Sequence, residues 1–461
     1  KSETDAESGL LYAYNALTFL EYSRGIFYIG DIPTETMSPK SDEAGDVYQL
    51  ENWIANRETE QLQYYFKYCY IAINRANTGI DHFQNSSVLS ETARRRILGE
   101  AYFLRAWNYF NLVRTFGIVP VQTKMVAELS QTTPPMATGL DQLYDLILGD
   151  LTRADNLLEV NKVFGRADKV AAQSLMAKAY LTIASSKEHN VHRYTEMRRE
   201  PQIMYDSAAY WAGKVVRDYK NVYDFDTNLR DIYDVDKPTG PEHIFIMPID
   251  RSGTQEGNYS KLPLLFLPSN NSVPFYIRYG NGDLQRANGN GWGVFLCNDE
   301  FVETQFSTTD KRRTELIHRD IYDASGNPIV PNQVKGYFSS KYVDPDFIGE
   351  RTSARPYLIR FSDIALVYAE AAGPEAGLAY VNRIRERAGV TPLPSGMTTD
   401  KFREAVIKER ALELAFEGNR LYDLRRTASV TTTDIKAAGL SEAEAAYYPI
   451  PQREIDLNPN L

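Results

Sequence analysis

Residues 91–120, ETARRRILGEAYFLRAWNYFNLVRTFGIVP, decide the fold class of this 461-residue chain. Ser90 is typical of a helix start, and Gly117 with Pro120 is typical of a helix stop. A helix between them has apolar side chains on every face: Ile97, Leu104 and Leu112 on one, and Phe103, Trp107 and Phe110 on others. Because such a helix must be covered on several sides, the stretch predicts the centre of a helical protein.

Other segments have apolar residues three or four positions apart, which is the pattern of amphipathic helices. This spacing predicts helices over residues 61–81, 140–158, 167–183, 204–219, 361–372, 375–388, 400–416 and 419–425. Small residues gather in the third of these, as where helices cross closely. Paired helices of this length are typical of tetratricopeptide-like repeats, in which each pair buries its apolar face against a neighbour. We expect a mainly α protein with eight to ten principal helices and short strands.

Helical periodicity stops between residues 221 and 356, where glycine, proline, asparagine and aspartate are frequent. A structureless insertion of this length is implausible in a compact protein, so an ordered, loop-rich lobe is expected there. Ligand-binding residues are concentrated in such loops. One domain is therefore predicted, with a helical-repeat scaffold over 1–220, the lobe over 221–356, and C-terminal helices and tail over 357–461.

Charge and cysteine content limit the function. There are 51 basic and 61 acidic residues, a formal charge of −10, which argues against nucleic-acid binding. No segment approaches the roughly 20 apolar residues that cross a bilayer. The start, residues 1–5, is polar without an apolar signal core, and we expect it to act as a flexible tether. Cys69 and Cys297 lack partner motifs and are interpreted as small buried residues.

Motifs for enzymatic chemistry are missing from the sequence. It contains no GxxxxGK[ST] phosphate loop and no GxSxG nucleophile elbow. The aspartates between Asp224 and Asp236 lack the order of an EF-hand and are interpreted as a solvated loop. Carboxylates are abundant, so a glycoside hydrolase stays open as an alternative. We predict no enzyme activity, no cofactor and no metal site.

The densest charge lies in residues 408–426, KERALELAFEGNRLYDLRR. Charged residues recur every third or fourth position on a helix whose other positions are apolar. This spacing predicts pairs between arginines and carboxylates of neighbouring helices. We interpret the block as structural rather than catalytic.

At these residues the chain resembles the SusD/RagB family of outer-membrane nutrient-binding lipoproteins. The resemblance rests on four separated blocks: FLRAWNYFNLVRTFGIVP (103–120), LIRFSDIALVYAEA (358–371) with VNRIRERAG (381–389), ERALELAFEGNRLYDLRR (409–426) and YPIPQREIDLNPNL (448–461). Their order covers essentially the whole chain. Asn419 stands where the family often has histidine, a departure confined to a structural block.

The resemblance implies a tetratricopeptide scaffold, a loop-rich face that binds a nutrient, commonly a glycan, and a SusC-like TonB-dependent transporter as partner. It also implies tethering at the outer-membrane surface through a lipidated cysteine. That cysteine is not among these residues, so the sequence is expected to start just after it. None of the four blocks is expected to belong to the ligand site, which the family builds from variable loops.

The leading function is therefore a noncatalytic surface protein that captures an oligosaccharide and passes it to a transporter. The alternative is a protein of the same fold that binds peptide. Aromatic residues are 12% of the chain, and loop aromatics can stack on sugar rings. The predicted ligand-binding residues are Trp292, Tyr276, Tyr279, Arg278, Asn290, Tyr48 and Trp53.

Trp292 is the strongest candidate, because Gly291 and Gly293 leave its ring uncrowded and no helical stripe includes it. Tyr276 and Tyr279 flank Arg278 in the same lobe, so one loop can offer stacking and hydrogen bonding. Trp53 is less secure, because it can also cap the helix that contains Leu62. Packing inside the protein is the competing interpretation for each aromatic residue.

Overall fold

The computed structural model describes residues 2–40, 45–252, 260–329, 334, 336–347 and 351–461. In this part of the chain, ten helices have 11 residues or more: α1 (Glu3–Thr18), α2 (Leu20–Gly30), α4 (Glu60–Phe83), α5 (Glu91–Phe116), α6 (Leu140–Leu157), α7 (Lys169–Glu188), α8 (Pro201–Asp218), α13 (Phe361–Ala372), α14 (Pro374–Arg387) and α15 (Thr399–Glu413). The prediction of a mainly α fold is confirmed.

The other elements are short. Among the residues described, nine α-helices have seven residues or fewer: α3 (Asp46–Glu51), α9 (Leu229–Ile232), α10 (Leu262–Phe266), α11 (Asp299–Gln305), α12 (Lys311–Leu316), α16 (Arg420–Arg426), α17 (Val430–Thr433), α18 (Glu442–Ala446) and α19 (Gln452–Leu457). Six strands are described: β1 (His243–Ile246), β2 (Phe275–Arg278), β3 (Leu284–Ala287), β4 (Ile317–His318), β5 (Phe338–Ser339) and β6 (Tyr357–Arg360). They form three two-stranded antiparallel pairs, β1 with β6, β2 with β3, and β4 with β5.

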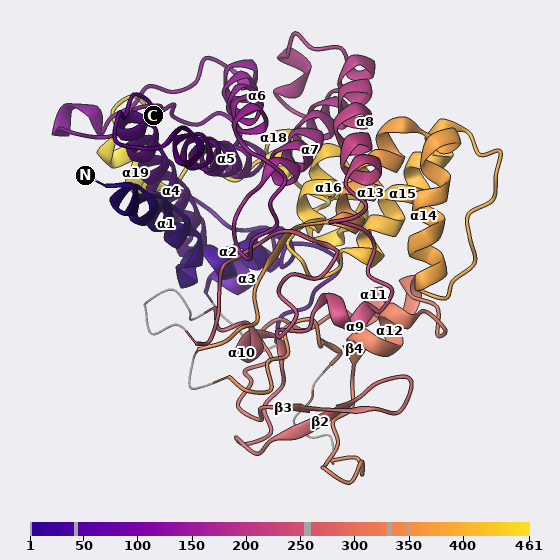
Figure 1. The fold of residues 1–461 in the computed structure, drawn as a ribbon. Coiled ribbons are helices and arrows are strands. Elements are labelled where there is room, and N and C mark those ends of the chain that lie inside the picture. Colours follow the sequence, from indigo (N-terminus) through magenta and orange to yellow (C-terminus); the bar gives the residue numbers. More distant parts are fainter. Residues whose placement is uncertain (1, 41–44, 253–259, 330–333, 335, 348–350) are drawn as a thin grey trace.

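The helices form an arc in which each of α4 to α7 packs on the helix that follows it, and α8 packs on α13 (Figure 1). Helix α5 lies between α4 and α6 and is buried on several faces, as its sequence predicts. The indole of Trp107 donates a hydrogen bond to the hydroxyl of Tyr22 at 3.0 Å, and Tyr22 donates to Asn108 at 2.9 Å. Arg105 is paired with Asp150 through two hydrogen bonds of 2.7 and 2.8 Å. Even the polar residues of this helix are therefore held by partners.

Small residues allow the close helix crossings. A Cβ atom at Gly377 of α14 would lie 2.5 Å from the Cα atom of Ala369 in α13. A Cβ atom at Gly99 of α5 would lie 2.6 Å from the Cγ atom of Leu158, just after α6. Neither distance is compatible with a larger side chain, so glycine sets the spacing of both contacts.

The start of the chain differs from the expected flexible tether, because Glu3–Thr18 is a helix. Ser2 and Asp5 form a capping box, with hydrogen bonds of 3.2 and 2.7 Å between each side chain and the other residue's backbone N–H. The apolar stripe that docks α1 on the scaffold consists of Ala6, Leu10, Ala13 and Leu17. Leu11 and Tyr12 lie beside the stripe but are exposed, so the apolar residues of this segment do not show one clear face in the sequence.

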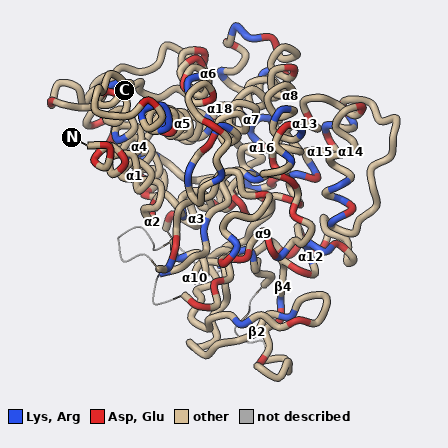
Figure 2. The backbone as a smooth tube through the Cα atoms, in the orientation of Figure 1, with Lys and Arg blue, Asp and Glu red and all other residues tan. Residues whose placement is uncertain are grey.

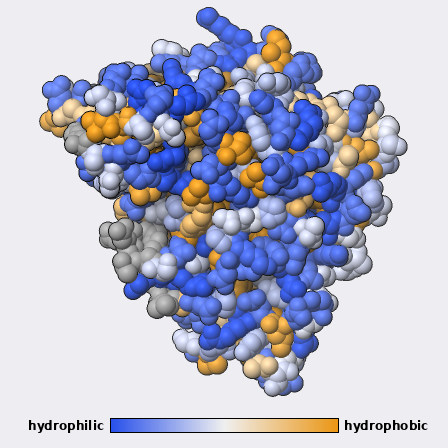
Figure 3. All heavy atoms as spheres, viewed as in Figure 1, coloured by the Kyte–Doolittle hydropathy of each residue, from blue (hydrophilic) through white to orange (hydrophobic). Residues whose placement is uncertain are grey.

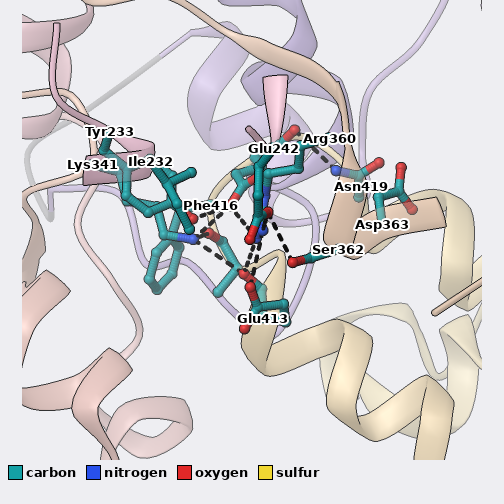
Figure 4. A network of polar contacts seen from close by, with 12 residues as sticks. Ile232, Tyr233, Glu242, Lys341, Arg360, Ser362, Asp363, Glu413, Phe416 and Asn419 are labelled. Carbon is teal, nitrogen blue, oxygen red and sulfur yellow. Dashed lines mark hydrogen bonds and ion pairs between the residues drawn. The ribbon is translucent and has the colours of Figure 1, made fainter. Parts of the chain in front are cut away.

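Basic and acidic residues alternate along the C-terminal helices (Figure 2), and charges of the predicted block pair between elements, as expected (Figure 4). The side chain of Arg360 is 1% exposed and donates to Glu242 at 2.7 Å, to Glu413 at 2.9 Å and to Glu417 at 2.8 Å. Lys341 also donates to Glu417 at 2.7 Å. These contacts join the residue before β1, the segment after β5, the end of β6, α15 and the segment before α16. We call these five residues the Arg360 cluster.

Neighbouring positive charges keep the carboxylates of the Arg360 cluster ionised. Burial by itself raises the pKa of Glu242, but the guanidinium groups of Arg387 and Arg360 outweigh burial and lower that pKa to about 2. The same balance lowers the pKa of Glu417, where Arg360 and Lys341 supply the positive charge. Asn419, which stands where the family often has histidine, lies beside the cluster in Figure 4.

The described residues between 221 and 356, which we call the lobe, lie below the arc, around α10, β2 and β3 (Figure 1). The lobe has a small apolar core of its own, which includes Phe275, Ile277, Ile321 and Phe338. Strand β1 of the lobe pairs with β6, which leads directly into α13. This pairing ties the lobe to the C-terminal helices.

Candidate functional site

The loop that carries Trp292 is held by its backbone. A Cβ atom at Gly289 would lie 1.9 Å from the carbonyl oxygen of Val273, and one at Gly291 would lie 2.1 Å from that of Leu267. The backbone N–H of Trp292 donates to the carbonyl of Leu264 at 2.6 Å. Only glycine permits such close approach, so the glycines fix this loop against α10 and the segment before β2.

The side chain on this loop points outward. Trp292 is 45% exposed, although tryptophan is highly buried on average. The ammonium nitrogen of Lys261 lies 5.4 Å from the centroid of its ring, within range of a cation–π contact. An exposed indole on a loop fixed by main-chain contacts is a preformed flat surface.

Strand β2 presents two more candidates on one face. Its burial alternates, with Phe275 and Ile277 turned into the lobe and Tyr276 and Arg278 turned outward. The backbone of Tyr276 exchanges hydrogen bonds of 2.8 and 2.9 Å with Tyr322. The guanidinium of Arg278 lies 4.2 Å from the centroid of the Tyr322 ring. Tyr322 was not predicted from the sequence, because its pairing with β2 depends on a turn that follows it.

Two predicted residues are buried and are withdrawn as direct ligand contacts. Trp53 is 8% exposed, stacks on Tyr448 with ring centroids 6.1 Å apart, and donates its indole N–H to Asp434 at 3.3 Å. Tyr279 is also 8% exposed and packs edge-on against His318. Burial raises the pKa of Tyr279 to about 12. Both rings contribute packing, which was the competing interpretation.

The remaining candidates are exposed. Asn290 lies on the loop of Trp292, where its backbone forms an isolated β-bridge with Ser269. Tyr48 is 52% exposed on α3. The segment that leads toward α3 pairs with the residues just after Trp292, because the N–H of Ser38 donates to the carbonyl of Leu296 at 2.9 Å. The structure thus gathers Tyr276, Arg278, Asn290 and Trp292 in one lobe and places Tyr48 on a neighbouring helix.

The scaffold has a separate groove that the sequence did not reveal. It has a volume of about 1360 Å³ and runs along α4, between α1 and the C-terminal tail. Its apolar lining includes Tyr12, Tyr70, Phe83, Leu129 and Leu457. These residues come from four distant parts of the sequence, so no local pattern marks the groove.

Metal-ligand clusters and exposed thiols are both missing from the described residues. No cluster of three or more His, Cys, Asp or Glu side chains in this part of the chain is placed to hold a metal ion. Cys69 and Cys297 are both buried and free, as predicted, and burial raises the pKa of each thiol. None of the described helices combines the length and apolarity needed to span a membrane.

The face of the molecule in Figure 3 is mostly hydrophilic, with hydrophobic residues scattered across it rather than gathered in one large patch. Single apolar side chains on a surface are usual and do not by themselves mark a docking patch on this face.

Comparisons with known proteins find one family-model match in the N-terminal part of the chain and one in the C-terminal part. A family model described as the SusD family matches residues 320–461, and one described as starch-binding associating with outer membrane matches residues 21–181. SusD-like protein P2 of Formosa agariphila is 24% identical over an alignment of 409 residues that covers 82% of this chain and 74% of the relative.

Solved structures share the fold over the whole length. A SusD superfamily protein from Parabacteroides distasonis has a TM-score of 0.80 at 21% identity, covering 100% of this chain and 98% of that one. A structure described as a laminarin binding SusD-like protein has a TM-score of 0.78 at 23% identity, covering 99% and 98%. The two family models match the parts of the chain that contain the four sequence blocks, which agrees with the shared fold. The chain belongs to the SusD/RagB family.

Proposed function

We propose that this protein is a noncatalytic, cell-surface glycan-binding protein that delivers its ligand to a SusC-like TonB-dependent outer-membrane transporter. The observation that carries the proposal is the exposed ring of Trp292 on a loop whose backbone is fixed by Gly289 and Gly291. A preformed ring lets a sugar bind without the entropic cost of ordering a loop.

Other exposed residues would supply the rest of a sugar site. The C–H face of a pyranose would stack on the indole face opposite Lys261. Asn290 would accept and donate hydrogen bonds to hydroxyl groups from the same loop, and Arg278 would donate from the exposed face of β2. Tyr276 and Tyr48 are the further aromatic contacts of this proposal. A few placed polar groups around an apolar surface are usual for small-ligand recognition.

The family of this chain supports the proposed ligand class and the proposed location. One matching model is described as starch-binding associating with outer membrane, and one structural relative is described as laminarin binding. We infer an outer-membrane, surface location through a lipid anchor, a glycan as ligand, and a single binding unit in which the lobe of residues 221–356 carries the site on the helical scaffold.

Binding to arrays of glycans and peptides, followed by calorimetry of the hits, tests the ligand class. We expect saturable binding of at least one oligosaccharide and no new reducing ends after prolonged incubation. Binding to peptides alone would instead support the peptide-binding alternative, and release of reducing ends would support a hydrolase.

Purification from outer membranes in mild detergent tests the partner. We expect a TonB-dependent transporter to copurify in stoichiometric amount with the native protein. Recovery of the protein without any transporter under conditions that keep other membrane complexes intact would contradict this part of the proposal.

A further inference from the structure

The hairpin β2–β3 lies at the end of the lobe farthest from the arc (Figure 1) and carries aromatic and positive side chains on its outer face. Tyr276 pairs with Arg286 across the hairpin, and Arg278 pairs with Leu284. On its other side the backbone of Tyr276 forms an antiparallel bridge with Tyr322. Residues opposite each other in an antiparallel pair share a face, so Tyr322, Tyr276 and Arg286 form one row. We call this row, together with Arg278, the hairpin face.

The hairpin face is continuous with the loop of Trp292, because β3 leads directly into that loop. The carbonyl of Gly289, at the start of the loop, accepts hydrogen bonds from the backbone N–H groups of Asn270 and Ser272 at 2.7 and 3.0 Å. These two residues belong to the segment that leads into β2. Trp292 is six positions after Arg286, and a fully extended chain of that length spans at most about 22 Å. A single oligosaccharide chain can therefore contact both.

Both arginines of the hairpin face are exposed, and neither forms an ion pair with a carboxylate among the described residues. Arg278 donates to the carbonyl of Gly326 and lies over the ring of Tyr322. Nη1 of Arg286 donates to the carbonyl of Pro345 at 3.1 Å. Backbone carbonyls and an aromatic ring thus position the two guanidinium groups without neutralising them.

Acidic residues of the hairpin turn and of the adjoining turn are bonded elsewhere. Asp283, between β2 and β3, pairs with Arg230 at 3.0 Å. Asp323 accepts from the backbone N–H groups of Ser325 and Asn327, at 2.9 and 2.8 Å, within its own turn. These carboxylates therefore leave the positive charge of the hairpin face unbalanced.

Unbalanced positive charge on one face favours a negatively charged ligand. Arg278 and Arg286 are diagonal neighbours on the hairpin, which places their Cα atoms roughly 7–8 Å apart. Two like charges at this separation repel each other, and an anion bound between them offsets the repulsion. A guanidinium group also holds an oxyanion through paired, charge-assisted hydrogen bonds. The rings of Tyr276 and Tyr322 on the same face offer flat surfaces for the C–H faces of sugars.

We propose that the glycan bound at the lobe is anionic. Arg278 and Arg286 bind carboxylate or sulfate groups of its sugar units, and Tyr276 and Tyr322 stack on the sugar rings. This inference names the ligand class of the proposed function and rests on that function. It adds Arg286 and Tyr322 to the residues of the site.

Pairs of polysaccharides that differ only in charge test the ligand class. Polygalacturonate and alginate are each compared with their carboxyl-reduced forms, and iota-carrageenan and dextran sulfate with their unsulfated forms, by calorimetry at low and at high salt. We expect at least one charged polymer to bind about tenfold or more tightly than its neutral counterpart, and this difference to shrink at high salt, where exposed charges are screened. The uronate and sulfate arms distinguish the two sources of the negative charge. Charged polymers that all bind no better than their neutral counterparts would overturn the inference.

Arg278→Gln and Arg286→Gln test the site, and Arg198→Gln is the matched control. Arg198 is an exposed arginine of the scaffold, just before α8, so its loss changes the net charge of the protein by the same amount. We expect each of the two hairpin variants to weaken binding of the charged polymer about fivefold or more, as loss of a hydrogen bond to a charged group does, and the control to bind within about twofold of the wild type. Melting temperatures are measured on the same preparations. Since Arg286 is exposed and bonded to a single backbone carbonyl, Arg286→Gln decides the test if Arg278→Gln loses stability.

The inference and the proposed function fail in different ways. Saturable binding of neutral glycans alone supports the proposed function and overturns the anionic ligand. Binding of a charged polymer that both hairpin variants leave within twofold of the wild type overturns the hairpin face as its site. Binding of peptides without any glycan overturns both proposals.

Discussion

The Arg360 cluster and the Trp292 loop hold their residues in opposite ways. In the cluster, buried side chains make the contacts, and Arg360 alone joins three carboxylates. In the loop, backbone atoms and glycines make the contacts, and the side chain of Trp292 is left 45% exposed. A side chain that the fold does not need is available for a ligand, so the loop is where function is to be sought.

Arg360→Met is expected to show the largest effect. Removing one partner of a buried ion pair typically costs about 3–5 kcal/mol of the free energy of unfolding, because the remaining charges stay buried without compensation. Urea denaturation monitored by circular dichroism measures the loss. Arg383→Ala is the control, since Arg383 is 46% exposed and paired only at the surface with Asp224, where about 0–1 kcal/mol is expected. Equal losses in the two variants would contradict the structural role of the cluster.

Asp31→Asn tests the buried polar contacts through the pH dependence of stability. Asp31 is buried and accepts a hydrogen bond from the backbone N–H of Gly418. Burial raises the pKa of Asp31 to about 8, whereas the unfolded chain has a value near 3.8. Between these two values the folded protein keeps the Asp31 proton, whereas the unfolded chain releases it. The protonated Asp31 therefore contributes to stability in full below pH 3.8, and this contribution is lost as the pH rises toward 8. We expect the free energy of unfolding of the wild type to fall relative to that of Asp31→Asn between pH 4 and 8. Parallel pH profiles would show that Asp31 is ionised in the folded protein.

Gly289→Ala tests whether backbone contact holds the loop. A Cβ atom there would lie 1.9 Å from the carbonyl oxygen of Val273, so the loop must shift, at a cost of about 1–3 kcal/mol in unfolding free energy. Glycan affinity should fall as well, because Trp292 would move. At the control position, Gly139, a Cβ atom would meet nothing within 4 Å. If Gly289→Ala and Gly139→Ala have the same stability and affinity, the loop does not depend on that contact.

Much of the helical fold could be predicted from sequence, because apolar spacing is a local signal. Helix α5 was predicted over Glu91–Phe116 and is observed there, and the charged block of residues 408–426 was predicted to pair between helices. Helix α1 was missed because exposed apolar residues, Leu11 and Tyr12, blur the face formed by its buried residues. The capping pair Ser2 and Asp5 was the signal that could have revealed it.

The candidate site was less predictable, because burial depends on distant partners. Trp53 bonds to Asp434, which lies 381 positions away, so no local pattern separates it from Trp292. Tyr276 and Tyr279 are only three residues apart, yet Tyr276 lies on the outer face of β2 and Tyr279 lies in the lobe core. The register of β2 decides this difference, and a local sequence pattern does not reveal that register. Flanking glycines did mark Trp292.

The most direct test of the account is a paired measurement on Trp292→Ala, with melting temperature and glycan affinity determined on the same preparation. The account predicts a melting temperature within about 2 °C of the wild type, since surface substitutions usually change stability by less than about 0.5 kcal/mol. It also predicts that affinity for the best glycan falls about tenfold or more, as loss of a hot-spot aromatic residue does. A large fall in melting temperature would show that the ring is part of the core, and unchanged affinity at unchanged stability would remove Trp292 from the binding site.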